Sequence, residues 1–323
     1  MSAFVKKIPR NILIFGAAAH IGRPLAQYLT DNAPSIQLHL ATSNPGKREQ
    51  LHSSFPRACV VQADYNDVSS LAAALQGIEG VFVITPAGIP EAPAMTNLVT
   101  ALKAANSVVH IIRVMGVFPE FNPTRIPKTL GLGNLPFEHP AAKRILDESG
   151  LPVTYINSGA SFIDNLWLQI GPVKEKKTLV WPEHRVPFID PRDIAEVAAR
   201  LFLSDNAKHI GAFHTMNNGQ DWLTFEELSG ILSEVLGEPI AYDGSYEAFS
   251  GYYGPKLGPK VDVLWAFFKF EEANEVNWAL NNFVERTLGR KPVSVRDWLL
   301  EHKDALLKET KRPGWADRDI VPT

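Results

Sequence analysis

Cysteine is almost absent from this chain, since Cys59 is the single cysteine among 323 residues. A disulfide within the chain is therefore excluded, and we expect a reducing compartment. Cys59 stands in an apolar run at residues 58–61, which favours a buried structural side chain and leaves a reactive thiol as the alternative. The chain also lacks an apolar run of 18 residues and the apolar region of a signal peptide. We expect a cytoplasmic protein with no membrane partner.

A strong charge of either sign is missing too. The net charge of -3 gives no field that would gather nucleic acid or anionic lipid. The nine histidines show no spacing with carboxylates or thiols that is typical of a metal site. We therefore expect a small-molecule partner, no nucleic acid and no metal.

Residues 11–23 carry the main signal of the chain, a short apolar strand followed by small residues and an amphipathic helix. This order presents backbone N–H groups and a helix N-terminus to a pyrophosphate. Gly16 is placed for the tight turn and Gly22 for close packing of helix on strand, while Ala19 replaces the middle glycine of the usual pattern. An ordinary tight turn is the alternative interpretation. The residues predicted to contact the dinucleotide here are Gly16, Ala18, Ala19, His20, Ile21 and Gly22.

Strand-like and helix-like segments alternate through the first half of the chain. Strands are expected at residues 36–41, 58–62, 80–84, 108–114 and 151–156. Helices are expected at residues 45–53, 67–75, 91–105 and 137–146. Alternation of this kind implies right-handed crossovers and a parallel sheet. The predicted fold class is α/β, a Rossmann-type doubly wound parallel sheet.

Polar residues at the ends of later strands complete the predicted cofactor site. After the second strand, the hydroxyls of Thr42 and Ser43 precede Lys47 and Arg48, and no carboxylate is present to hold a ribose 2′-hydroxyl. This set suits a 2′-phosphate, so we predict NADPH in preference to NADH. The alternative is that the two cations only face solvent. Further strand-end residues predicted to line the same pocket are Asp64, Tyr65, Thr85 and Pro86.

Five segments in order resemble the NmrA-like branch of the atypical short-chain dehydrogenases/reductases. They lie at residues 16–22, 64–67, 186–195, 223–228 and 295–299. The resemblance implies an NAD(P)-binding Rossmann domain with a smaller, mainly helical substrate domain. It also implies that the backbone of Asn157 and Ser158 faces the nicotinamide, where the family usually has Arg-Pro-Gly. Members of the branch reduce quinones, dyes, phenylpropanoids or iminium ions, or bind the dinucleotide without turnover.

The domain boundaries follow from the order of these segments. We expect the NAD(P)-binding domain over residues 1–157 and the substrate domain over residues 158–311. A strand and helix at about residues 186–203 are expected to return to the Rossmann sheet. Residues 312–323 are polar and contain proline, which predicts a disordered tail.

The catalytic region departs from ordinary short-chain dehydrogenases, which use a Tyr-x-x-x-Lys pair on one helical face. Here His139 stands at the Tyr position, and Lys143, the residue that grips the nicotinamide ribose in those enzymes, is kept as a predicted cofactor contact. Met115 and Gly116 occupy the place of the helper Ser. His139 fits either an acid or base near neutral pH or a residue of the first helical turn ahead of a proline. Asp164 is an alternative acid.

The missing proton donor narrows the chemistry. Hydride addition to a ketone builds an alkoxide that needs a donor, whereas an iminium ion becomes a neutral amine and a quinone delocalises its charge. We predict an NADPH-dependent reductase of an imine, iminium, quinone-like or conjugated aromatic acceptor, with secondary metabolism as a candidate setting. Two alternatives stay open, an NAD(P)-binding redox sensor without turnover and a biosynthetic cyclisation catalyst acting on an iminium intermediate.

Aromatic residues in the second half predict a pocket for a large aromatic or polycyclic substrate. Residues 246–270 are rich in Gly and Pro, which predicts a long loop of the kind that forms lids. A surface loop with an apolar anchor, or a dimer contact, is the alternative, and both a monomer and a homodimer fit. An apolar stripe at residues 160–170 has helical spacing. The predicted substrate contacts are Met115, Phe118, Phe162, Trp167, Tyr252, Tyr253 and Trp265.

Overall fold

The chain is divided into two compact units, each built from segments far apart in sequence. The computed structural model describes residues 5–86, 88–117, 138–274 and 279–308. Unit 1 consists of Met1–Val117, Gly133–Ser158 and Pro191–Met216. Unit 2 consists of Phe118–Leu132, Gly159–Asp190 and Asn217–Thr323. The predicted tail at residues 312–323 lies outside the described residues.

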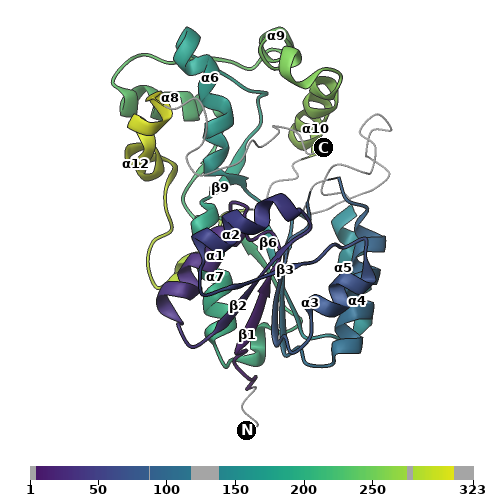
Figure 1. Ribbon diagram of the computed structural model, residues 1–323. Coiled ribbons are helices and arrows are strands. Elements are labelled where there is room, and N and C mark those ends of the chain that lie inside the picture. Colours follow the sequence, from purple (N-terminus) through teal and green to yellow (C-terminus); the bar gives the residue numbers. More distant parts are fainter. Residues whose placement is uncertain (1–4, 87, 118–137, 275–278, 309–323) are drawn as a thin grey trace. The chain divides into compact units, whose positions relative to one another are not determined.

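Unit 1 centres on a seven-stranded sheet in the order β10-β6-β5-β4-β1-β2-β3, with every pairing parallel (Figure 1). The strands are β1 (Asn11–Ile14), β2 (Gln37–Thr42), β3 (Cys59–Gln62), β4 (Gly80–Val83), β5 (His110–Met115), β6 (Val153–Ser158) and β10 (Phe213–Met216). The order reverses between β1 and β4, and such folds bind ligands at that point, outside the carboxyl ends of the strands. The predicted Rossmann-type fold is confirmed.

Helices cover both faces of this sheet (Figure 1). On one face lie α1 (Gly22–Asn32) and α7 (Pro191–Leu203). On the other lie α3 (Val68–Ala74), α4 (Glu91–Ala105) and α5 (His139–Ser149), and α2 (Arg48–Ser54) follows the 3-10 helix η1 (Pro45–Lys47). Asp67 caps α3, because its side chain accepts from the N–H groups of Ser69 and Ser70. Apolar side chains of the sheet and of α3, α4 and α5 fill the core between the sheet and these helices.

Unit 2 combines two small sheets with a set of helices. A three-stranded sheet has the order β11-β9-β7, and a two-stranded sheet pairs β12 with β8. These strands are β7 (Ser161–Phe162), β8 (Thr178–Val180), β9 (Val186–Ile189), β11 (Trp222–Leu223) and β12 (Ala241–Asp243). The helices are α6 (Leu166–Lys176), α8 (Phe225–Leu236), α9 (Tyr246–Leu257), α10 (Lys260–Asn274), α11 (Phe283–Leu288) and α12 (Val295–Lys308). Thr224 and Glu227 form a reciprocal capping box at the start of α8.

An aromatic cluster forms the centre of unit 2. The Trp181 ring lies 6.1 Å from Phe225, 5.7 Å from Phe249 and 5.5 Å from Tyr253, measured between ring centroids. It also packs against Phe268 of α10 at 5.2 Å. Most of these contacts are edge-on, the arrangement that aromatic quadrupoles favour. The cluster therefore joins β8, α8, α9 and α10 into one core.

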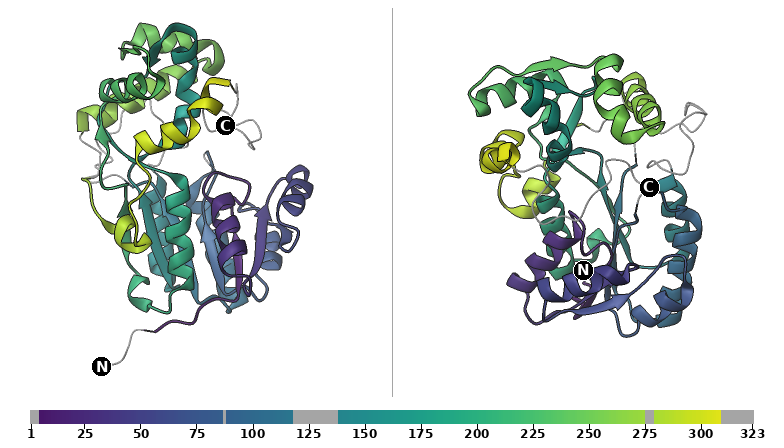
Figure 2. Two further views of the ribbon diagram at one scale, coloured as in Figure 1. Left: turned by 90° about the vertical axis from the view of Figure 1, so that its left-hand side faces the viewer. Right: turned by 45° about the horizontal axis from the view of Figure 1, so that its top comes forward.

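The predicted lid loop at residues 246–270 is wrong, since α9 and α10 occupy this stretch (Figure 2). Ser245 caps α9 by accepting from the Ala248 N–H. Phe249 and Tyr253, four residues apart, are buried on one face of that helix. Pro255 stands near the C-terminal end of α9, where it removes one late hydrogen bond. Tertiary packing thus outweighs the low helix propensity of the Gly and Pro residues.

Three smaller predictions also need correction. The strand at residues 186–189 does not join the Rossmann sheet but pairs with β7 and β11, and only the helix α7 that follows belongs to unit 1. Cys59 is exposed rather than buried, because it opens β3 at the edge of the sheet. The stretch 160–170 is not one helix, since β7 and the 3-10 helix η5 (Ile163–Asn165) precede α6.

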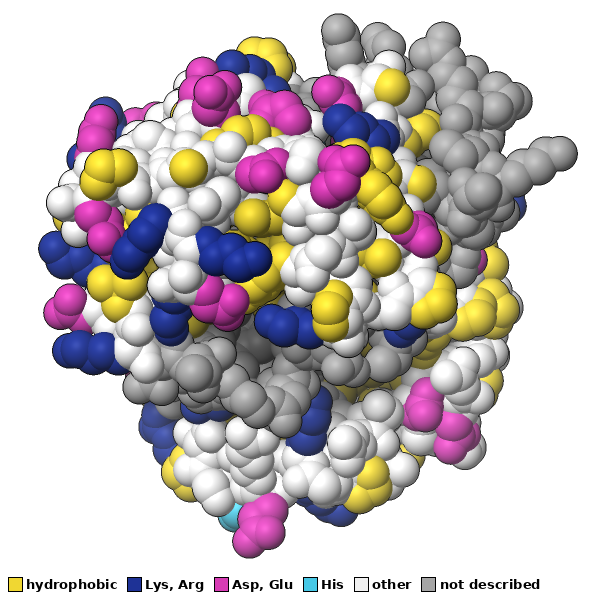
Figure 3. Space-filling model, turned by 90° about the horizontal axis from the view of Figure 1, so that it is seen from above, with side chains coloured by type: hydrophobic (Ala, Val, Ile, Leu, Met, Phe, Trp, Pro, Cys, Tyr) yellow, Lys and Arg dark blue, Asp and Glu magenta, His cyan; other side chains and the backbone are white. Residues whose placement is uncertain are grey.

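The surface of the molecule carries charges of both signs. Figure 3 shows acidic and basic side chains interspersed with apolar ones over the face seen from above. Within the described residues, no helix is both long and apolar enough to cross a bilayer.

Candidate functional site

The turn before α1 has the geometry of a dinucleotide cradle. Gly16 adopts φ +67°, a conformation that side chains disfavour, and a Cβ at Gly22 would lie 2.3 Å from the Gly16 carbonyl oxygen. The Ala19 N–H closes the turn by donating to that same oxygen at 2.8 Å. Ile21 precedes the helix, no side chain of the described residues caps it, and its first turn contains no acidic residue. In that turn the Arg23 N–H donates to the Ala19 carbonyl at 2.9 Å and Pro24 has no N–H, so the Gly22 N–H is the donor that an anion can meet.

The end of β2 holds the residues predicted to select the cofactor. Thr42 Oγ1 accepts from the Asn44 N–H at 3.1 Å, and the Asn44 side chain caps the 3-10 helix that follows. Ser43, Lys47 and Arg48 are exposed. The Arg48 guanidinium reaches a backbone carbonyl of β3 at 3.5 Å, the outer limit of a hydrogen bond. Both cations thus follow β2 closely, and both are exposed.

Asp64 and Tyr65 organise the turn after β3. Asp64 Oδ1 accepts from the Asn66 N–H at 2.8 Å. Tyr65 is buried, its hydroxyl donates to the Ile84 carbonyl at 3.1 Å, and its ring stacks on Phe15 with centroids 4.7 Å apart. Burial raises the pKa of the Tyr65 hydroxyl above its ordinary value. Tyr65 therefore ties the ends of three strands together.

Gly116 and Val117, directly after β5, are held from two sides. The Gly116 N–H donates to Nδ1 of His139, on α5, at 2.8 Å. The Val117 N–H donates to Oδ1 of Asn157, on β6, at 2.7 Å, and Asn157 Nδ2 donates back to the Val117 carbonyl at 3.1 Å. Two side chains that we predicted to serve the reaction or the cofactor thus fix the backbone at the carboxyl end of β5. Met115, just before them, is buried.

A buried ion pair lies beside His139. Arg113 Nη2 is 2.9 Å from Oε1 and 2.8 Å from Oε2 of Glu91, and the two side chains are 0% and 6% exposed. The Thr85 hydroxyl donates to Glu91 Oε1, and His139 Nε2 lies 3.5 Å from the same oxygen. Glu138 Oε2 accepts from the Glu91 N–H at 2.8 Å. We call Thr85, Glu91, Arg113 and His139 the Glu91 cluster.

The charge on Glu91 follows from these contacts. Burial raises the pKa of the Glu91 carboxyl, but the hydrogen bond from His139 and the charge of Arg113 outweigh burial and hold that pKa at about 2. The carboxylate is therefore ionised at neutral pH. Arg113 Nε and Nη1 have no hydrogen-bond partner within the described part of the chain, so the guanidinium depends on Glu91 for its counter-charge.

Lys143 is engaged within its own helix. Its Nζ lies 2.6 Å from Asp147 Oδ2 and 4.7 Å from the centre of the Tyr155 ring. The Tyr155 hydroxyl donates to Asp147 Oδ1 at 2.7 Å. His139 and Lys143 share one face of α5, as their spacing predicts, but their side chains contact different partners.

Apart from Met115 on β5, the described residues predicted to meet the substrate are distributed through unit 2. Tyr253 lies in the aromatic core and donates to the Val180 carbonyl at 3.3 Å, and the Tyr252 hydroxyl donates to Glu175 at 3.0 Å. Trp167 packs edge-on against Trp298. Phe162 and Trp265 are half-buried and Asp164 is buried, whereas Phe118 lies outside the described residues. Tyr253 is thus a core residue rather than part of a pocket wall.

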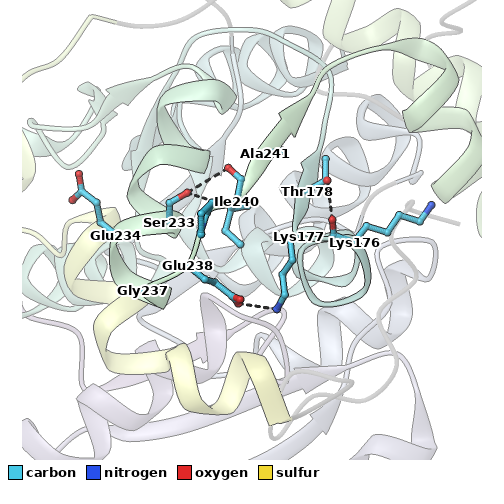
Figure 4. A pocket seen from close by; sticks show the side chains of 10 residues that line it. Lys176, Lys177, Thr178, Ser233, Glu234, Gly237, Glu238, Ile240 and Ala241 are labelled. Atoms are coloured by element: carbon cyan, nitrogen blue, oxygen red, sulfur yellow. Dashed lines mark hydrogen bonds and ion pairs between the residues drawn. The ribbon is translucent and has the colours of Figure 1, made fainter.

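One open pocket of about 820 Å³ lies in unit 2, between the ends of α6 and α8 (Figure 4). Lys177 and Glu238 point toward one another across it, with Nζ and Oε1 2.7 Å apart. No residue of the predicted site lines it. Among the residues that the structure describes, no group of three or more His, Cys, Asp or Glu side chains is arranged to hold a metal.

Sequence reasoning missed Glu91, Arg113, Glu138 and Asp147. Arg113 was the available signal, because it is a charged residue in the otherwise apolar run Ile-Ile-Arg-Val-Met. A charge inside a central strand requires a buried partner. The partner itself was not visible, because Glu91 also fits an ordinary acidic residue in the first turn of a helix.

Comparisons with known proteins give the chain its relatives. The family described as NAD(P)H-binding matches residues 16–204. Quinone oxidoreductase 2 of Escherichia coli is 26% identical over 240 residues, covering 73% of this chain and 78% of that protein. NAD(P)H azoreductase of Xenophilus azovorans is 26% identical over 265 residues, covering 79% and 86%. The structure of triphenylmethane reductase of Citrobacter sp. complexed with NADP(H) matches with a TM-score of 0.75 at 20% identity, covering 90% of this chain and 99% of that one.

Proposed function

Because this chain belongs to the NAD(P)H-binding family, within the NmrA-like branch of the atypical short-chain dehydrogenases/reductases that its sequence resembles, we propose that it is an NADPH-dependent reductase of an activated small-molecule acceptor. Relatives named as a quinone oxidoreductase and an azoreductase support a reductase of quinone-like acceptors. The preference for NADPH over NADH, and imine or iminium acceptors, are further parts of the proposal.

The start of α1 is the observation that carries the proposal. The Gly22 N–H meets no side-chain cap, and a Cβ at Gly22 would find no room beside Gly16. A helix N-terminus of this kind binds a diphosphate through backbone donors and the helix dipole. The buried Ser158 Oγ, at the carboxyl end of β6, has no hydrogen-bond partner in the described part of the chain and fits a further polar contact. These residues suit NADPH, which supplies a hydride when bound.

Lys47 and Arg48 support the preference for NADPH. Both follow β2, the strand whose end holds the adenine ribose in this fold, and both are exposed. No carboxylate stands between β2 and Arg48 to bond a ribose 2′-hydroxyl or to repel a 2′-phosphate. We therefore assign the two cations to the 2′-phosphate.

The acceptor class follows from the groups that are already engaged. His139 and Asn157 bond the backbone of Gly116 and Val117, so neither offers a free polar atom equivalent to a Tyr or Ser proton donor. An iminium carbon that gains a hydride becomes a neutral amine, and a quinone that gains one becomes a delocalised anion that water protonates. Neither needs a strong acid from the protein.

NADPH oxidation by the purified full chain tests this proposal. The acceptors are a quinone, an azo dye, a cyclic iminium ion and a simple ketone, and cofactor affinity is titrated alongside with NADPH and NADH. We expect turnover with at least one of the first three, none with the ketone, and tighter binding of NADPH. Turnover of the ketone alone would contradict the acceptor class.

A redox sensor is the second candidate, and the Lys143–Asp147 ion pair favours it, because the lysine that would grip the nicotinamide ribose is held elsewhere. Tight NADPH binding without oxidation by any acceptor would support the sensor.

A further inference from the structure

The imidazole of His139 is oriented at both of its nitrogen atoms. The Gly116 N–H donates to Nδ1 at 2.8 Å, and a backbone N–H is a donor only. Nδ1 must therefore be the unprotonated nitrogen, and the neutral ring carries its proton on Nε2. Nε2 faces Glu91 Oε1 at 3.5 Å, which is the arrangement expected for a proton directed at a carboxylate.

Glu91 is itself fixed from three directions. Arg113 Nη2 contacts both carboxylate oxygens, the Thr85 hydroxyl donates to Oε1, and Glu138 holds the Glu91 backbone N–H. The carboxylate is buried at the start of α4, so it cannot turn toward solvent. An anion held in this way favours the tautomer of His139 with its proton on Nε2.

We propose that Glu91 is the positioning residue of this site: through the Nε2–H tautomer of His139 it holds the Gly116 backbone at the carboxyl end of β5, and His139 does not supply the proton of the reduction. The inference rests on the proposed reductase function. It assigns a role to the buried Glu91–Arg113 pair, and it resolves the two interpretations of His139 that the sequence leaves open.

The protonation state of the ring excludes His139 as the acid that protonates the reduced substrate in this arrangement. A neutral ring that gives up its Nε2 proton becomes an imidazolate, which is far too basic to form at neutral pH. To act as an imidazolium acid, the ring would first gain a proton on Nδ1 and lose the Gly116 hydrogen bond. The acceptors that remain are those whose hydride adduct is neutral or is protonated by water, the iminium and quinone classes.

The first experiment compares two substitutions of His139 in the full chain. In His139→Asn, the amide oxygen can accept the Gly116 N–H in place of Nδ1 but cannot act as an acid. In His139→Phe, the ring volume is kept and the acceptor is lost. We expect His139→Phe to lower kcat/KM about tenfold, the effect of one lost hydrogen bond that orients a site. We expect His139→Asn to recover most of that loss with a pH profile unchanged in shape.

The opposite pattern would overturn the proposal. A hundredfold loss of kcat in His139→Asn, together with loss of one limb of the pH profile, is the result expected for a general acid. Recovery by His139→Asn separates a positioning role from a merely structural one, because Asn fills the ring site less well than Phe and would do worse if only filling mattered.

The second experiment needs no turnover. Ring-labelled ¹⁵N-histidine spectra of the unliganded chain report the tautomer directly, and the signal lost in His139→Asn identifies His139. We expect a protonated Nε2 and an unprotonated Nδ1. A protonated Nδ1 would overturn the inference even if the reductase activity stands. If the chain shows the expected tautomer but fails to oxidise NADPH with any of the acceptors tested, the positioning role stands and only the proposed function is overturned.

Glu91 is tested by the double variant Glu91→Gln/Arg113→Met, which removes both charges together and leaves no unpaired buried charge. An amide both donates and accepts, so only the Gly116 N–H would still favour the Nε2–H tautomer, and we expect the share of the Nδ1–H tautomer to rise and kcat/KM to fall about tenfold. The matched control is Glu196→Gln/Arg200→Met, which removes the ion pair on α7 whose atoms are 2.7 Å apart. A wild-type tautomer and kcat/KM in the Glu91 variant would refute the role of Glu91.

Discussion

The Lys143 ammonium lies 2.6 Å from Asp147 Oδ2, one helical turn further along α5. Asp147 Oδ1 accepts from the Tyr155 hydroxyl, so the carboxylate is fixed at both oxygens. Lys143 is the one member of the usual catalytic pair that this chain keeps. If Lys143 holds the ribose of a bound dinucleotide, as we propose, that contact competes with an ion pair inside its own helix.

This competition predicts opposite effects for two substitutions. Asp147→Asn keeps the acceptor for Tyr155 but removes the charge that holds Lys143, and it should lower the Kd for NADPH about twofold, the scale of a half-exposed ion pair. Lys143→Met should raise the Kd about tenfold through loss of a charged hydrogen bond. Fluorescence titration of NADPH measures both. Lys103→Met, an exposed lysine on α4, is the control for the change of charge, and equal effects of Lys103→Met and Lys143→Met would contradict the assignment.

Lys47→Ala/Arg48→Ala tests the choice of cofactor. If the two cations bind the 2′-phosphate, the Kd for NADPH should rise about tenfold while the Kd for NADH changes less than about twofold. The double variant Lys103→Ala/Lys208→Ala removes the same charge from other exposed positions of unit 1. A parallel loss for NADPH and NADH would show that the cations act on the fold or on the whole dinucleotide. The titration at 50 and 200 mM salt separates a phosphate contact from general attraction.

The nucleotide-binding half of the fold was predictable because its signals are local. Strand and helix periods, the small residues at 16–22 and the cap at Asp67 each act within a few neighbouring residues. Contacts across the chain were not predictable in this way. Glu91 and Arg113 are 22 positions apart and lie on different elements, and only folding brings them together. The same limit applies to His139, whose partners Gly116 and Glu91 decide its role.

The stretch at residues 246–270 illustrates a different limit. Its glycines and prolines favour a loop by local propensity, yet the buried side chains of Phe249 and Tyr253 stabilise α9 against the Trp181 ring. Each helical glycine costs roughly 1 kcal/mol and Pro255 about 3 kcal/mol, and α9 forms because burial of its aromatic face in the Trp181 cluster outweighs these costs. Local helix propensity was therefore the smaller effect. The larger effect, burial of the aromatic side chains, depended on residues about 70 positions earlier in the chain, as the Tyr253–Val180 hydrogen bond spans 73 positions.

Gly22→Ala tests the cradle before α1. Its Cβ would lie 2.3 Å from the Gly16 carbonyl oxygen, so the helix must shift away from β1. The backbone N–H at its start would then no longer point toward the bound diphosphate. We expect the Kd for NADPH to rise more than about tenfold. Ala19→Gly is the matched control, because it restores the middle glycine of the usual pattern and should leave the affinity within about twofold. Circular dichroism establishes that both variants fold, and wild-type affinity in folded Gly22→Ala would refute the role of this turn.

The buried Glu271 carboxyl makes the stability of unit 2 depend on pH. Burial raises its pKa from 4.5 to about 8, and the His184 ring lies beside it, with Nε2 3.7 Å from Glu271 Oε2. Desolvation lowers the pKa of His184 to about 4, and the Pro182 carbonyl accepts a hydrogen bond from its Nδ1. Glu272 and Lys269 lie close to the same ring and influence it in opposite directions. The acid and the imidazole are thus both neutral in the folded chain at neutral pH.

The sign of the Glu271 effect follows from proton uptake. Between pH 4.5 and about 8 the folded chain holds the Glu271 proton while the unfolded chain releases it, so this group makes the unfolding free energy fall as pH rises. Glu271→Gln removes that dependence and should stabilise unit 2 by about 4 kcal/mol more at pH 8 than at pH 4.5. All seven tryptophans fall within the residue ranges of unit 2, so urea unfolding followed by tryptophan fluorescence reports this unit alone. Glu272→Gln is the control, since its exposed ion pair with Lys269 contributes less than about 1 kcal/mol. Parallel stability curves for the wild type and Glu271→Gln across this range would mean that the carboxyl is already ionised in the folded chain.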